Sequence, residues 1–131
     1  MGYHVVRAEE IEFVERPPNP GEAEPRQAGD ITTPAELKQS RARMWHYPPH
    51  TRGKRHQDHV QEETFVVISG TLTMLLGDPP ERIEGLGPQS VVAVEPMTPL
   101  QVRNESEEEL VLYIYGAPPE QAGADMLPDV D

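Results

Sequence analysis

The sequence contains no cysteine, so disulfides, thiolate catalysis and cysteine-ligated zinc sites are all excluded. Aromatic residues make up only 5% of the chain, and a core must therefore be built mainly from valine, leucine and isoleucine. Basic residues are also scarce. The chain has 11 lysines and arginines and 23 aspartates and glutamates, which gives a formal net charge of −12. Such a charge repels phosphate backbones and anionic lipids, so we expect neither nucleic acid nor a membrane surface as a partner.

Long apolar runs are missing as well. Nowhere do 18 apolar residues follow one another, and the N-terminal MGYHVVRAEE has no basic region followed by an apolar one. Val6 stands where a myristoylated N-terminus carries serine or threonine. We therefore expect a cytoplasmic protein that folds, at 131 residues, as a single domain with one core.

Turn-forming residues are abundant, with 10 glycines and 15 prolines. Residues 16–31 are rich in proline, glycine and charge and predict an irregular arm, preceded by a short strand around residues 4–7. The sequence TPAE at residues 33–36 matches a capping box with proline at the first helical position, which predicts a short helical turn. We expect residues 1–40 to pack on the main fold and residues 117–131 to form a flexible tail.

From residue 41 to residue 116 the pattern is that of β-strands. In the segment RARMWHY, residues 41–47, the side chains of Arg43, Trp45 and Tyr47 share one face of an alternating strand. Further strands are predicted at residues 64–69, 71–76, 90–94, 100–103 and 110–115. Many short strands separated by frequent turns predict an all-β fold, either a sandwich or a small barrel.

Two segments carry a more specific signal. The sequence HQDHVQEE at residues 56–63 ends at Glu63, which is followed by six residues and Gly70, and His59 stands four residues before Glu63. A second segment, PMTPLQVRN, occupies residues 96–104. In these spacings the chain resembles the cupin superfamily, over residues 41–116. The resemblance implies a double-stranded β-helix, or jelly-roll barrel, with a short N-terminal helical turn and an irregular N-terminal arm.

The resemblance also implies where a metal would bind. Of the four metal ligands of the family, His59 and Glu63 stand in register here. Gln57 stands where the first histidine belongs, His56 comes one residue too early, and Leu100 replaces the histidine of the second motif. The implied site is therefore degenerate and would hold iron, manganese, nickel or zinc only weakly.

Strand periodicity gives an independent prediction for the same residues. In a regular strand Gln57, His59 and Glu63 point into the barrel, and His56 points outward unless a bulge turns it. Three arrangements stay open: a metal site, a hydrogen bond between His59 and Glu63 without metal, and exposure of both side chains to solvent.

Two functions follow from these residues. The first is a small-molecule-binding cupin, in which Leu100 makes the cavity more apolar and His59, oriented by Glu63, serves as a general acid or base. The alternative is a metal-dependent dioxygenase or isomerase that uses His59 and Glu63 together with Gln57 or His56. Neither hypothesis identifies the substrate, because one fold can host many chemistries.

The strand at residues 41–47 suggests two further roles. Arg43, Trp45 and Tyr47 would line a mouth that binds an anionic or ring-shaped ligand, or else they would pack against a second subunit. We expect a homodimer, because the strand with Met44 and Trp45 and the proline-rich arm offer surface to bury.

Overall fold

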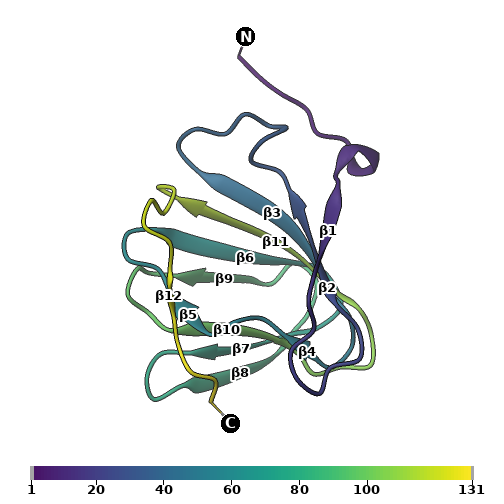
Figure 1. Ribbon diagram of the computed structural model, residues 1–131, viewed down its shortest axis with the longest axis vertical. Coiled ribbons are helices and arrows are strands. Elements are labelled where there is room, and N and C mark those ends of the chain that lie inside the picture. Colours follow the sequence, from purple (N-terminus) through teal and green to yellow (C-terminus); the bar gives the residue numbers. More distant parts are fainter. Residues whose placement is uncertain (1, 131) are drawn as a thin grey trace.

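The computed structural model describes residues 2–130 and consists of two antiparallel sheets (Figure 1). In order, the first sheet contains β1 (Phe13–Arg16), β2 (Arg26–Asp30), β3 (Arg41–Tyr47), β11 (Leu110–Ala117), β6 (Glu62–Ser69) and β9 (Val91–Val94). The second contains β12 (Asp125–Met126), β5 (His56–Gln57), β10 (Leu100–Asn104), β7 (Leu72–Leu76) and β8 (Glu81–Leu86), and β4 (Thr51–Arg52) also pairs with β10. The predicted all-β jelly-roll fold is confirmed.

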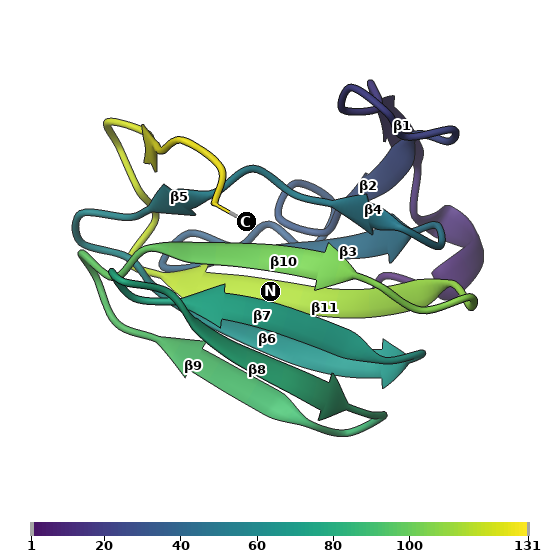
Figure 2. The ribbon, with the colours of Figure 1, turned by 90° about the horizontal axis from the view of Figure 1, so that it is seen from below.

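The two sheets are layers that bury a shared core, and in Figure 2 β10 and β7 lie in front of β11 and β6. The core is aliphatic apart from two aromatic rings, as the composition predicts, and it contains Val67, Leu72, Met74, Leu110 and Leu112 among its most buried members. At one end of the barrel some core residues also line a cavity. Phe65, Leu100 and Val102 belong both to the core and to the wall of that cavity.

The N-terminal region differs from the expectation. The helical element of the described chain is a 3-10 turn, η1 (Ala8–Glu10), and the first strand is β1 rather than residues 4–7. Residues 26–30 of the expected irregular arm form β2, because β3 offers its backbone hydrogen bonds even to a sequence poor in strand-forming residues. The 3-10 turn agrees with the expected short N-terminal helical turn, but it lies at residues 8–10, and residues 32–36 form hydrogen-bonded turns with Glu36 at φ 54°. Among residues 2–130 no helix is long and apolar enough to cross a membrane.

The C-terminal segment makes specific contacts with the second sheet. Residues 118–130, here called the C-terminal strap, follow β11 and pass over the second sheet (Figure 1). Within it β12 pairs with β5, and the Glu120 carboxylate accepts hydrogen bonds from the backbone N–H groups of residues 59–61 at 2.7–3.3 Å. Further along, Asp129 accepts a hydrogen bond from Gln101 at 3.1 Å. The strap therefore makes strand-pairing and hydrogen-bond contacts with the barrel, while the flexibility expected for residues 117–131 stays a prediction.

Candidate functional site

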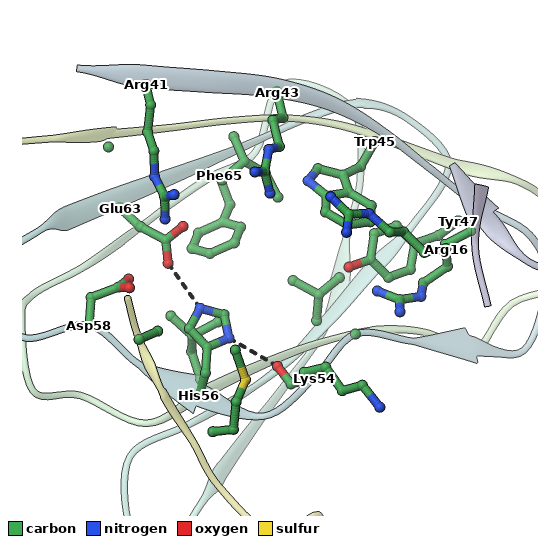
Figure 3. Close-up of a pocket in the computed structure, with 18 of the residues that line it drawn as sticks. Arg16, Arg41, Arg43, Trp45, Tyr47, Lys54, His56, Asp58, Glu63 and Phe65 are labelled. Atoms are coloured by element: carbon green, nitrogen blue, oxygen red, sulfur yellow. Dashed lines mark hydrogen bonds and ion pairs between the residues drawn. The ribbon is translucent and has the colours of Figure 1, made fainter. Parts of the chain in front are cut away.

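A cavity of about 590 Å³ lies between the two sheets at the open end of the barrel (Figure 3). Its walls come from β3, β5, β6 and β10, and they are completed by two segments from the ends of the chain. These are the proline-rich residues 16–20 and residues 123–126 of the strap. The volume is in the range that accommodates small organic molecules.

Three titratable side chains meet at one end of this cavity. Nε2 of His56 lies 3.3 Å from Oε1 of Glu63, and Nδ1 of His56 lies 3.0 Å from the backbone carbonyl of Lys54. Asp58 joins them, so that one ligand atom from each of His56, Asp58 and Glu63 lies within 4.8 Å of the others. Figure 3 shows the three side chains directed toward one another. One imidazole and two carboxylates form a donor set suited to a divalent metal.

His56 faces the cavity because of its partner strand. In the pairing of β5 with β10, His56 lies opposite Leu100, and paired residues project from the same face of a sheet. Leu100 lines the cavity, so His56 does too. β5 ends at Gln57, after which the backbone of residues 59–61 is held by Glu120, so the alternation predicted through to Glu63 is interrupted.

Burial and hydrogen bonding set the charges of the cluster. Burial and the hydrogen bond to Glu63 raise the pKa of Asp58 to about 7, so its carboxyl group holds a proton near neutrality more readily than an exposed one. Burial alone would raise the pKa of Glu63, but hydrogen bonds from His56 and Asp58 lower it overall. Burial opposes the charged form of His56, yet the hydrogen bonds to Glu63 and to the Lys54 carbonyl raise its pKa. Both His56 nitrogens face oxygen acceptors, as suits an imidazolium.

The structure does not bring His59 and Glu63 together, which corrects the expected geometry. Nε2 of His59 lies 2.8 Å from Oδ2 of Asp125 at the rim, and 43% of the His59 side chain is exposed. Gln57 also faces this rim and donates to Asp125 at 3.2 Å. Neither His59 nor Gln57 lines the cavity, because the chain leaves the strand after Gln57. Of the four predicted metal ligands, only His56 and Glu63 meet.

The strand face predicted from residues 41–47 does border the cavity. Arg43, Trp45 and Tyr47 all line it, together with Leu100 from the opposite sheet. Trp45 and Tyr47 pack against each other with ring centroids 5.6 Å apart. A role for these side chains in ligand binding stays a prediction.

Sequence reasoning missed Asp58 and three arginines that also line the cavity. Arg41 donates from Nε to the buried amide of Gln61 at 3.4 Å. Arg16 and Arg26 come from β1 and β2, and both place their guanidinium groups over Trp45. No sequence signal links Arg16 and Arg26 to the site, because the arm that carries them precedes the barrel and has no strand period. Arg41, in contrast, shares the alternating face of Arg43, Trp45 and Tyr47 on β3. Asp58 could have been found from its place between His56 and His59, had the end of β5 been known.

Comparison with known proteins agrees with this architecture. A family model described as a cupin domain matches residues 43–115, which is more than half of the chain. No curated protein matches the chain.

Many solved structures share the fold. One is an uncharacterized conserved protein with a double-stranded β-helix domain from Klebsiella pneumoniae, with 19% identity over 95% of this chain and 97% of that chain and a TM-score of 0.70. A polyketide cyclase from Streptomyces resistomycificus has 14% identity over 97% of this chain and 87% of that one, with a TM-score of 0.74. A protein from Thermotoga maritima, described as a predicted oxalate decarboxylase, has 14% identity over 88% of this chain and 99% of that one, with a TM-score of 0.72. At these identities the similarity shows the fold alone.

Proposed function

The chain belongs to the cupin superfamily, and on that premise we propose that it binds a small organic molecule in its barrel and transfers protons on it. The observation that supports this most directly is the His56–Glu63 pair in the wall of a cavity of about 590 Å³. A cavity of this size, with apolar residues and a few polar groups in its lining, is typical of binding sites. The reaction class is isomerisation or epimerisation next to a carbonyl group.

The roles of the two side chains follow from their contacts. Nδ1 of His56 donates to the Lys54 carbonyl, which fixes the ring and leaves the proton on Nε2 toward Glu63 and the cavity. In the proposed reaction Glu63 accepts a proton from the carbon beside the carbonyl group, and His56 donates one to the carbonyl oxygen. Return of the proton from Glu63 to the neighbouring carbon, while His56 takes back a proton from the hydroxyl group on the first carbon, gives the isomer. Return of the proton to the first carbon after the planar enol has turned over in the cavity gives the epimer. His56 thus takes the role that the sequence assigned to His59.

The first prediction concerns proton exchange. Hydroxy ketones, keto acids and aldoses are incubated with the protein in D2O, and proton NMR follows the loss of the C–H signal beside the carbonyl group. Trp45, the one tryptophan of the chain, lines the cavity and reports binding through its fluorescence. His56→Gln should lower the exchange rate roughly 100-fold while binding changes little, since general acid–base groups contribute about 10²–10⁴-fold.

His59→Gln is the matched control, because His59 lies at the rim beside Asp125 and should leave exchange unchanged. Exchange that is lost in His59→Gln and kept in His56→Gln would overturn the assignment. A fluorescence signal that no compound of the panel alters would count against ligand binding of this class.

A second candidate is a metal-dependent cupin enzyme, a dioxygenase or an isomerase, and one observation favours it. Oδ1 of Asp58 is buried and has no hydrogen-bond partner among the described residues. Buried polar atoms normally have a partner, and a cation would supply one. His56, Asp58 and Glu63 would hold iron, manganese, nickel or zinc, which would polarise an oxygen atom of the ligand as a Lewis acid.

Metal content decides between the two candidates. The protein is purified without chelator or nickel resin, and its metals are measured by inorganic mass spectrometry. If the second candidate holds, the protein should contain near-stoichiometric metal that Asp58→Asn lowers at least about tenfold, because one of three protein ligands is weakened. Asp125→Asn, at the rim, should leave the content unchanged. Metal-free protein with normal proton exchange would contradict the second candidate.

The expected homodimer also stays a prediction. Trp45 lines the cavity and is therefore less available to a second subunit than the sequence implied. Surface for an interface exists elsewhere, because β1 is an edge strand and its Val14 is 63% exposed.

A further inference from the structure

Three arginines in the cavity wall have no carboxylate partner among the described residues, unlike Arg52 and Arg82 on the outer surface. On the outer surface Arg52 pairs with Asp129 at 2.7 Å, and Arg82 pairs with two glutamates. Within residues 2–130, no carboxylate lies within ion-pair distance of Arg16, Arg26 or Arg43, although the chain has 23 acidic residues. In a protein of net charge −12, arginines left without carboxylates indicate a binding role.

Arg26 shows the arrangement most clearly. Its side chain is only 5% exposed, and its Nε has no hydrogen-bond partner among the residues described. Its guanidinium lies 5.4 Å from the ring centroid of Trp45 and 5.6 Å from that of Tyr47. Cation–π attraction to the two rings and a side-chain hydrogen bond to Tyr47 hold the guanidinium, and Nε stays without a partner. The guanidinium is thus positioned, but its charge is not neutralised, which is unfavourable for a buried cation.

The neighbouring arginines concentrate positive charge on the same wall. Arg16 lies 5.8 Å from the Trp45 ring centroid, and Figure 3 shows Arg43 between this group and the Glu63 end of the cavity. Burial lowers the pKa of Arg43, and the charges of Arg41 and Arg16 lower it further, against the smaller opposing influence of Asp30 and Glu63. An anion bound among these side chains would relieve their mutual repulsion.

We propose that Arg16, Arg26 and Arg43 bind the oxyanion group of the ligand, a carboxylate or a phosphate monoester. Guanidinium groups bind both through paired N–H···O hydrogen bonds. The remainder of the ligand extends along the cavity toward His56 and Glu63, which lie beyond Arg43 (Figure 3). The inference rests on the proposed function, since it names the substrate class of the same cavity: a small organic anion with its reacting carbon at the His56 end.

Three probes with the same ring test the charge requirement: phenyl phosphate, benzoate and neutral benzyl alcohol. Binding is measured by calorimetry at low ionic strength. At least one anion should bind 10-fold or more tightly than benzyl alcohol, and the stronger of the two identifies the oxyanion. Equal affinity for the three probes, or no anion binding, overturns the inference.

Variants locate the site. Arg16→Gln and Arg43→Gln alter side chains open to the cavity and should each weaken anion binding 10-fold or more while binding of benzyl alcohol stays constant. Arg82→Gln removes an arginine that pairs with glutamates outside the cavity and serves as the control. Arg26→Lys keeps the charge without the guanidinium fork and should also weaken anion binding, with thermal melting used to confirm its fold. Anion affinity unchanged in both Arg16→Gln and Arg43→Gln overturns the inference.

The outcome is separable from that of the proposed function. His56→Gln should leave anion affinity within twofold of the unmodified protein, because His56 lies at the other end of the cavity. Anion binding without proton exchange on any carbonyl compound would sink the proton-transfer function and leave the anion site standing. Proton exchange that is faster on neutral than on anionic compounds would overturn the anion site and leave the proton-transfer function standing.

Discussion

Leu100→His should raise the affinity of the barrel for Co²⁺ or Zn²⁺ by about 100-fold or more, because it adds a second imidazole to a three-ligand cluster. Leu100 lies directly opposite His56 in the pairing of β10 with β5 and lines the cavity. Cβ atoms of such cross-strand neighbours are about 4.5–5.5 Å apart, which is close enough for two imidazoles to bind one ion. The histidine would join His56, Asp58 and Glu63.

Cobalt(II) titration, read from the visible absorption of the bound ion, measures the change in affinity. The matched control is Leu76→His, since Leu76 lies opposite Leu100 on the other neighbouring strand and outside the cavity. Equal affinities in the two variants would show that the His56 cluster is not the binding site. Gln57→His, which the sequence pattern also favoured, would instead add a donor beside His59 and Asp125 on the rim.

The fold could be predicted from sequence because each of its signals is local. The alternation in residues 41–47 and the spacing from Glu63 to Gly70 can both be recognised without knowing which distant residues are in contact. Gly70 shows why the spacing is strict. It has φ +85°, and a Cβ there would lie 2.9 Å from the Cα of Leu110, so a side chain would be strained by both the backbone and its neighbour.

The site could be predicted only in part, because it depends on where one short strand ends. A regular strand from Gln57 to Glu63 would place His59 inside and His56 outside. The chain ends β5 at Gln57, and Glu120, about 60 residues further along the sequence, holds the following backbone. A contact of that sequence separation leaves no periodic signal. The same holds for Arg16 and Arg26, which reach Trp45 from a proline-rich arm.

Asn104 closes the second motif, and its substitution by alanine should lower the free energy of unfolding by about 3–5 kcal/mol. The side chain is 1% exposed, and its amide nitrogen donates to the carbonyl oxygens of Tyr47 at 2.9 Å, Pro48 at 3.1 Å and Glu108 at 2.8 Å. Its oxygen accepts from the backbone N–H of Ser106 at 3.0 Å and from its hydroxyl at 2.8 Å. Alanine would leave these carbonyls without their donor, in a region closed to water.

The consequence reaches the cavity, because Asn104 ties the turn before β11 to the end of β3. Tyr47, the last residue of β3, contributes its ring to the cavity wall and its carbonyl group to Asn104. Urea unfolding measures the loss in Asn104→Ala, and Ser106→Ala is the control, since it keeps all three carbonyl contacts and should cost only about 1 kcal/mol. If both variants unfold at the same urea concentration, the three carbonyl contacts contribute nothing measurable. If Asn104→Ala unfolds at a much lower urea concentration than Ser106→Ala, the closing asparagine of the motif holds the end of β3 in place through these three carbonyl contacts.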